Sequence, residues 1–289
     1  MSQAVLAAGL IVAAQLYVRG NRRLAHRRGR WRQAAFAAAL VLIGLALCTP
    51  YDRIADRSLA AHMLQHIVLM GFVPPLLMLA APWTFFWRVL PLRARRRVAP
   101  RAMRLRHLIS PWPAFLLLNI DLAVWHVPWL YDLTLRSEAV HYLEHATFLF
   151  TGTLFWIPIL DSPPLHARLN ELQAAGFALA GLATGWVLAL VLAFAPSPLY
   201  PAYASLHHRL FGLSALADQQ IAGGLMLAIG AIPLSVAVFV FLYRWLDEAA
   251  RNAPRHTAAS KAKIAIAPVK LANNVVVMPL GKRRGLGNR

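Results

Sequence analysis

Two pairs of histidines have a spacing that suits metal binding. His62 and His66 are four residues apart, and His141 and His145 repeat that spacing. Side chains at positions i and i+4 of a helix lie on the same face, so each pair presents two imidazoles to one side of its helix. Imidazole is a good ligand for copper, zinc, iron and nickel. Together with His126, the two pairs predict a metal site between three helices.

Sulfur, carboxylate and amide side chains accompany these histidines. Met63 offers a thioether, and Cys48, the single cysteine, offers a thiolate. Both sulfur atoms suit Cu(I), so the two residues are further candidate ligands. A carboxylate that accepts a hydrogen bond from a ligating imidazole fixes the orientation of the ring. The candidates for that role, or for handling protons, are Asp121, Glu144, Asp218 and Gln219.

The composition predicts a membrane protein. Of the 289 residues, 59% are hydrophobic and only 14% are charged, and the mean hydropathy is +0.53. Soluble domains carry about 25% charged residues. The apolar content excludes a largely disordered chain. The single cysteine excludes a disulfide framework and metal sites held by several cysteines.

Seven apolar segments have the length of membrane-spanning helices. A helix needs about 20 mostly apolar residues to cross the hydrocarbon layer. Lipid cannot satisfy exposed backbone groups, so each segment is predicted to be helical. The segments are residues 3–18, 34–49, 61–81, 112–127, 139–160, 174–195 and 219–243. The fold class is therefore predicted as all-α, with a seven-helix transmembrane domain in residues 1–245 and a basic, flexible cytoplasmic tail in residues 246–289.

The basic residues predict an orientation in the membrane. Of the 30 Lys and Arg residues, 26 fall in the segments after the first, third, fifth and seventh spans. Cytoplasmic segments of membrane proteins carry the excess of Lys and Arg. The N-terminus is therefore predicted outside and the C-terminus in the cytoplasm. Seven of the 11 histidines, His207 and His208 among them, then lie in or near the outer leaflet.

The net charge of +19 is by itself also typical of nucleic-acid-binding proteins. The basic residues stand in blocks between apolar segments, however, and the tail has no aromatic residues that could stack on bases. Membrane lipid is therefore the expected partner of the basic segments, and nucleic acid is not.

Other residues have a predicted structural role. Pro74 and Pro75 are expected to kink the third span, because each lacks a backbone donor. Gly223 and Gly224 are expected to allow two helices to approach closely in the seventh. A belt of aromatic residues is expected at the outer interface, made of Trp125, Trp129, Tyr131, Tyr200 and Tyr203.

Four motifs carry a resemblance to a known family. They are His62-x-x-Gln65-His66, Trp125-His126-x-Pro128-x-x-Tyr131, His141-x-x-Glu144-His145 and Asp218-Gln219-x-x-Ala222-Gly223, and the segment Pro198-Leu199-Tyr200-Pro201 also fits. Over residues 40–245 the chain resembles the CtaG family of bacterial cytochrome c oxidase assembly proteins. The resemblance implies a multi-pass protein of the bacterial inner (plasma) membrane that helps to mature a haem–copper oxidase. It also implies that the motif histidines are His62, His66, His126, His141 and His145 and that the Asp-Gln motif is Asp218-Gln219.

The leading hypothesis is therefore an assembly factor and not an enzyme. The outer-leaflet histidines would bind copper, expected as Cu(I), and pass it to haem–copper oxidase subunits. A periplasmic copper donor is a further expected partner. The alternative is a haem-binding electron-transfer or quinone protein, since paired histidines also serve as axial ligands. A proton transporter built on Asp121, Glu144 and Asp218 and a purely structural polar network are two other interpretations.

Overall fold

The chain is built from helices. The computed structural model describes residues 3–22, 29–48, 50–206 and 212–266, with side chains except at residues 52, 88–89, 102–103, 105 and 253–266. These ranges contain no strand, and an isolated bridge pairs Ser162 with Leu165. The predicted all-α class is confirmed. His207, His208 and residues 267–289 of the predicted tail lie outside the described ranges.

The helices follow the apolar segments of the sequence. They are α1 (Gln3–Arg22), α2 (Arg30–Leu47), α3 (Tyr51–Ala55), α4 (Leu59–His66), the π-helix η1 (Ile67–Phe72), α5 (Val73–Ala80), α6 (Trp83–Val89), α7 (Leu92–Arg104), the 3-10 helix η2 (Leu105–Ile109), α8 (Pro111–Trp125), α9 (Pro128–Arg136), α10 (Glu138–Trp156), α11 (Glu171–Phe194), α12 (Pro201–Ala204), α13 (Ala215–Ala228) and α14 (Ile232–Ile266). Each of the seven predicted spans coincides with one of these helices or with a consecutive pair or triplet of them.

The number of spans differs from the prediction. Within the described ranges, five stretches are long and apolar enough to cross a membrane, namely Gln3–Arg22, Arg30–Leu47, Leu59–Ala80, Glu171–Phe194 and Ala215–Asn252. The pair α8 and α9 adds a sixth if its bend of 74° is counted as one broken span. Helix α10, where the fifth span was predicted, is not apolar enough on average to qualify as a membrane span, although it has 19 residues. Its first half carries Glu138, His141, Glu144 and His145, which lower its hydropathy. The count of seven is therefore not confirmed.

The third predicted span contains a π-helix where the prolines were expected to produce a kink. The helical stretch from Leu59 to Ala80 continues past Pro74 and Pro75, and the six residues before Val73 form η1. A proline ring clashes with the carbonyl four residues before it. The wider turn of a π-helix relieves this crowding, and it is a frequent feature of functional sites. The Val73 N–H accordingly donates to Val68 O, five residues back.

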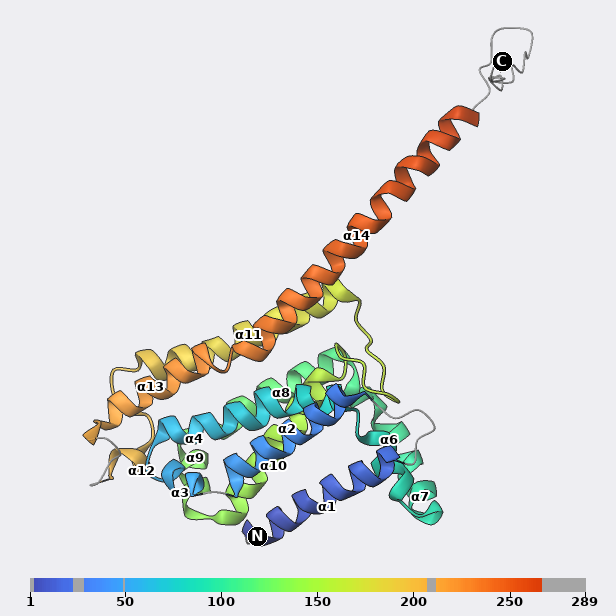
Figure 1. Cartoon of the computed structure of the whole chain (residues 1–289). Coiled ribbons are helices and arrows are strands. Elements are labelled where there is room, and N and C mark those ends of the chain that lie inside the picture. Colours follow the sequence, from blue (N-terminus) through green and yellow to red (C-terminus); the bar gives the residue numbers. More distant parts are fainter. Residues whose placement is uncertain (1–2, 23–28, 49, 207–211, 267–289) are drawn as a thin grey trace, which may run out of the picture. The chain divides into compact units, whose positions relative to one another are not determined.

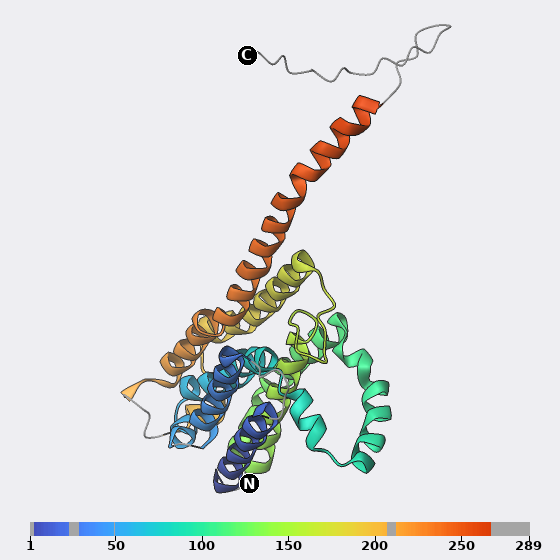
Figure 2. The ribbon, with the colours of Figure 1, turned by 45° about the vertical axis from the view of Figure 1, so that its right-hand side comes forward.

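Helices that are distant in the sequence pack together within the larger of two compact units, Met1–Leu242. Helix α13 packs on α4 and on α11, helix α10 packs on α8 and η1, and α2 packs on α5. The ribbons of α11 and α13 lie side by side in both views (Figures 1 and 2). As a result, α4, α8 and α10 are neighbours, and α13 covers the start of α4.

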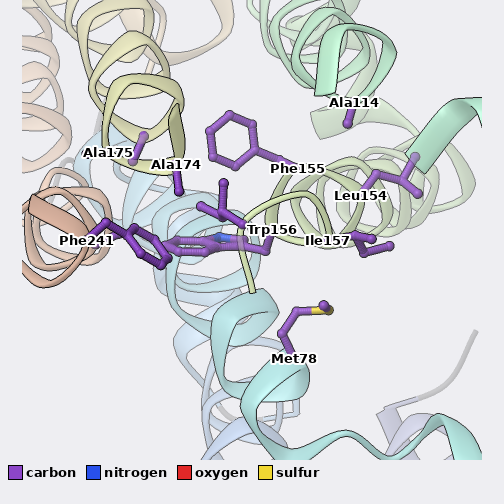
Figure 3. Close-up of a cluster of buried hydrophobic side chains, with 12 residues drawn as sticks. Met78, Ala114, Leu154, Phe155, Trp156, Ile157, Ala174, Ala175 and Phe241 are labelled. Carbon is purple, nitrogen blue, oxygen red and sulfur yellow. The ribbon is translucent and has the colours of Figure 1, made fainter. Parts of the chain in front are cut away.

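An apolar cluster holds the second half of α10 in place. Phe155 and Trp156 at the end of α10 are buried together with Met78 of α5, Ala174 of α11 and Phe241 of α14 (Figure 3). The cluster brings together side chains from five helices. Because α10 rises about 1.5 Å per residue, Phe155 lies roughly 15 Å along the helix from His145. Helix α10 is therefore anchored by apolar packing at one end and carries its polar residues at the other.

The smaller unit, Tyr243–Arg289, contains the remainder of α14. This helix has 35 residues and continues to Ile266, so residues 246–266 of the predicted tail are helical. The segment is rich in Ala, Lys and Arg, which are among the best helix formers.

The contact between α11 and α13 depends on one glycine. A Cβ atom placed on Gly223 would lie 2.6 Å from Ala193 N and 2.7 Å from Ala189 O, which is too close for any side chain. A Cβ atom on the neighbouring Gly224 would meet nothing within 4 Å. The close approach predicted from the two glycines is therefore confirmed for Gly223 and assigned to that residue alone.

Substitution of Gly223 is therefore expected to destabilise the protein. The change Gly223→Ala should lower the free energy of unfolding by about 1–3 kcal/mol, because it overpacks a tight helix contact. Gly224→Ala is the matched control and should be neutral or slightly stabilising, since Ala is the better helix former. The measurement is the thermal unfolding midpoint of the purified chain in detergent. Equal midpoints for the two variants would contradict the assigned contact.

Candidate metal centre

Four polar side chains from two helices meet inside the protein. His62 and His66 come from α4, and Glu144 and His145 come from α10. Each offers one ligand atom, and these four atoms all lie within 4.8 Å of one another. The side chains are buried, with exposures of 0% for His62 and Glu144, 3% for His66 and 4% for His145. This group has the size and the donor types of a metal site.

Most polar atoms of the group have no hydrogen-bond partner among the described residues. These atoms are Nε2 of His62, both ring nitrogens of His66 and of His145, and both carboxylate oxygens of Glu144. The Glu144 oxygens lie 3.7 Å from His62 Nε2 and 3.5 Å from His66 Nε2, which is longer than the usual hydrogen-bond range. Leaving a buried donor or acceptor unpaired costs about 1–3 kcal/mol each. A cation bound between the four residues would satisfy these atoms together, so the residues present fit a metal ion.

Hydrogen bonds orient His62 toward the group. The Tyr203 hydroxyl donates to Ala55 O at 2.8 Å and lies 2.9 Å from His62 Nδ1. The single hydroxyl hydrogen goes to the carbonyl, which can only accept, so His62 Nδ1–H is the donor to Tyr203. Burial raises the pKa of Tyr203 well above its ordinary value, and the phenol stays protonated. His62 therefore directs the lone pair of Nε2 into the group.

His126 is oriented in the same way at the end of α8. Its Nδ1 lies 2.8 Å from Leu122 O, and because a carbonyl only accepts, this nitrogen carries the hydrogen. His126 Nε2 is buried and has no partner among the described residues. The ring centroid lies 6.3 Å from that of His66. His126 is therefore next to the four-residue group but is not a member of it.

The fifth predicted histidine also borders the group. The ring of His141 lies 4.2 Å from that of His145 and 4.9 Å from that of His62, measured between centroids. The structure thus brings all five predicted histidines together. Three of them, with Glu144, have ligand atoms close enough to share one ion.

Asp121 belongs to a layer of hydrogen-bonded side chains about one helical turn from the four-residue group. The other members of this layer are Trp125, Thr147 and Thr151. Trp125 Nε1–H donates to Asp121 Oδ1 at 2.9 Å and to Thr147 Oγ1 at 2.8 Å. The Thr151 hydroxyl donates to Asp121 Oδ2 at 2.8 Å. The Thr147 hydroxyl donates to the Glu144 carbonyl oxygen at 3.0 Å. This bond links the layer to the turn of α10 that carries Glu144 and His145.

Asp218 caps the helix that carries two of the histidines. Its carboxylate accepts hydrogen bonds from the Ser58 hydroxyl at 2.8 Å, from Leu59 N–H at 2.7 Å and from Ala60 N–H at 3.3 Å. The first backbone N–H groups of a helix have no partner within the helix, and a carboxylate there also favours the helix dipole. Asp218 on α13 therefore fixes the start of α4. Among the described residues, none of its hydrogen bonds goes to an imidazole.

Gln219 and Gln65 also hold backbone segments. Gln219 Oε1 accepts from Leu199 N–H at 2.7 Å, and its amide nitrogen donates to Leu192 O at 3.1 Å. Gln65 Nε2 donates to Ala46 O at 2.8 Å, which ties α4 to the end of α2. These amides position the chain around the group.

The two sulfur residues lie elsewhere. The side chain of Met63 is buried in an apolar cluster with Leu59, Tyr131 and Tyr200. Cys48 follows the last residue of α2, where its backbone N–H donates to Gly44 O. The sulfur atom of Cys48 is not part of the four-residue group.

The predicted aromatic belt was wrong for most of its members. Trp129 is 69% exposed, as expected at an interface, but Trp125, Tyr131, Tyr200 and Tyr203 are buried. The ring of Tyr131 lies 5.1 Å from that of His62 and 4.3 Å from that of Tyr200, so these aromatics form one wall of the site. The role of Tyr203 was missed, because His62 and Tyr203 are 141 residues apart in the sequence.

Comparison with known proteins assigns the chain to a family. The family model described as cytochrome c oxidase caa3 assembly factor matches residues 15–248, which contain all four motifs and the site. The chain belongs to the caa3 assembly factor family. The resemblance noted from the motifs is thereby confirmed.

The chain also matches uncharacterised proteins of Mycobacterium bovis and Mycobacterium tuberculosis. Each is 24% identical to it over 261 residues, which is 86% of this chain. The chain spans about two fifths of the length of these relatives, 39% in each case. No solved structure matches it.

Removal of the Asp218 charge is expected to loosen α4. The change Asp218→Asn should lower the free energy of unfolding by about 1.5–3 kcal/mol, the range for hydrogen bonds to a charged group. The exposed Asp161, which accepts one hydrogen bond from Ala167 N–H, provides the matched control Asp161→Asn. The measurement is thermal unfolding of the purified chains in detergent. An Asp218→Asn midpoint equal to that of the control would contradict the capping role.

Proposed function

We propose that this chain is a copper-binding assembly factor that assists the maturation of the copper site of a haem–copper oxidase. Membership of the oxidase assembly family supports the process. The observation that carries the copper assignment is the buried group of three histidines and one glutamate with unpartnered polar atoms. Copper is the cargo of this protein, and the chain itself has no catalytic role.

The site is proposed to face the outer side of the bacterial inner membrane. The basic residues after the odd-numbered predicted spans support this orientation, with the N-terminus outside and the C-terminus and basic tail in the cytoplasm. The starts of α4 and α10 and the end of α8 then lie toward the outside. Oxidase subunits and a periplasmic copper donor are the proposed partners on that side.

The residues of the chain bind the ion and shield it. Helices α4 and α10 supply the ligands, and the bonds from His62 to Tyr203 and from His126 to Leu122 set the direction of the imidazoles. The group is almost fully buried, so water and competing ligands are kept from the ion. Orientation of a ligand by a hydrogen-bonded partner typically contributes 10–100-fold, roughly, to metal affinity.

The packing of the rings favours a single ion over haem. The centroid of His66 lies 4.5 Å from that of His62 and 5.4 Å from that of His145. His141 contacts the same two rings from its own position on α10. The gap between His62 and His145, where a macrocycle would lie, is therefore filled by side chains.

Removal of two ligands tests the proposal. The purified chain in detergent should bind about one copper ion, the stoichiometry of a single preformed site. The double variant His66→Ala, His145→Ala should lose this copper, because two of three imidazole ligands are removed. His166→Ala is the control, since this histidine is 78% exposed and distant in sequence from the motifs. The measurements are copper analysis of the protein and oxidase activity of membranes that contain each variant. Unchanged copper stoichiometry in the double variant would overturn the proposal.

Loss of the Tyr203 hydroxyl should weaken copper binding without abolishing it. The change Tyr203→Phe removes the acceptor for His62 Nδ1–H and should reduce the copper affinity by about 10–100-fold. Tyr142→Phe, on α10 outside the ligand group, is the control. A chelator competition titration measures both affinities. Equal affinities would show that the bond between Tyr203 and His62 does not orient the ligand.

A further inference from the structure

The donor atoms of the metal group are of one chemical kind. Three are imidazole nitrogens and one is a carboxylate oxygen, and the thiol of Cys48 does not belong to the group. Thioether and thiolate sulfur select Cu(I), whereas carboxylate oxygen binds harder, more highly charged ions. Of the two sulfur residues near the site in the sequence, Cys48 lies outside the group, and the Met63 side chain is buried in the apolar cluster with Leu59, Tyr131 and Tyr200. We infer that the site holds copper in the divalent state, Cu(II), an inference that rests on the proposed function.

The position of Glu144 is that of a metal ligand and not that of a carboxylate that orients a ligating imidazole. Its two oxygens are fully buried, and no described residue donates a hydrogen bond to either. A carboxylate that orients an imidazole would accept a hydrogen bond from the ring at about 2.7–3.2 Å. The distances to His62 Nε2 and His66 Nε2 are 3.7 Å and 3.5 Å, so those nitrogens and the carboxylate converge on a common space. A fourth ligand of this kind is expected for a divalent ion.

The charges near the site also match a divalent ion. Asp121 accepts a hydrogen bond from Trp125 at Oδ1 and shares one with Thr151 at Oδ2, while the Thr151 hydroxyl also contacts Thr147 O at 2.9 Å. Asp121 is linked through Trp125 and Thr147 to the helix turn of Glu144. The described part of the site has no Lys or Arg paired with either carboxylate. The buried charge of Glu144 is costly in apolar surroundings, and a divalent ion attracts it more strongly than a monovalent ion does.

The test compares the two oxidation states in the full chain with and without the Glu144 charge. Copper(II) and, under anaerobic reducing conditions, copper(I) are titrated separately into the purified protein in detergent, with chelators of known affinity as competitors. For Glu144→Gln we expect the Cu(II) affinity to fall by at least about 100-fold. Loss of a ligand should weaken metal binding more than loss of a group that orients a ligand, which typically costs about 10–100-fold in affinity. The Cu(I) affinity should change little, because all imidazoles remain, and this also reports that the variant is folded.

A second variant and a spectrum complete the experiment. Glu138→Gln makes the same change in the first turn of α10, at an exposed position, and should leave both affinities unchanged. Bound Cu(II) should give an electron paramagnetic resonance spectrum with coupling to several nitrogens. Binding of Cu(I) but not Cu(II), or an unchanged Cu(II) affinity in Glu144→Gln, would overturn the inference and leave the proposed function intact. Failure to bind copper in either state would overturn both.

Discussion

The buried carboxylate of Glu144 is the constraint on which the arrangement of the bundle depends. Transfer of a charge from water into a protein interior costs several kcal/mol even after relaxation. Glu144 is fully buried, and the nearest polar atoms are imidazole nitrogens too distant for strong hydrogen bonds. Such a group persists only if the surrounding structure holds it in place and its charge is compensated. The contacts around α4 and α10 meet the first of these requirements.

Besides the bond between Tyr203 and His62, several surrounding contacts position the four-residue group by fixing the backbone of the helices that carry it. Asp218 holds the start of α4, and Gln65 holds its last turn against α2. On the other side, Gly152 lets α10 approach η1 so closely that a Cβ atom there would lie 2.8 Å from Met70 O. The register between α4 and α10, and hence the distance between His66 and Glu144, follows from these contacts. Asp218 and Gln65 belong to the motifs but not to the four-residue group, and these contacts give each of them a positioning role.

Sequence reasoning succeeded where a single periodic pattern sufficed. The helices and the convergence of the histidine pairs follow from apolar length and from i, i+4 spacing, both of which are local. The role of Asp218 was not predictable in this way, because its partners at residues 58–60 are about 160 positions distant and the carboxylate has the same chemistry as an orienting group. The tyrosines were misplaced for a related reason. An aromatic residue near the end of a span packs equally well against lipid or against an interior, and only tertiary structure distinguishes the two environments.

The failure of α10 to qualify as a span has the same cause as the site itself. Its first half carries two glutamates and two histidines, which no helix facing lipid could accommodate. Its second half is an apolar anchor in the cluster around Phe155. Helix α10 is covered by α8, α9, η1 and α5, so Glu144 and His145 face protein, whereas Glu138 is exposed. A hydropathy criterion judges a helix by its own residues and therefore excludes a helix whose polar side chains are buried against its neighbours. The helix that this criterion excludes therefore supplies Glu144 and His145, two of the four residues of the candidate metal group.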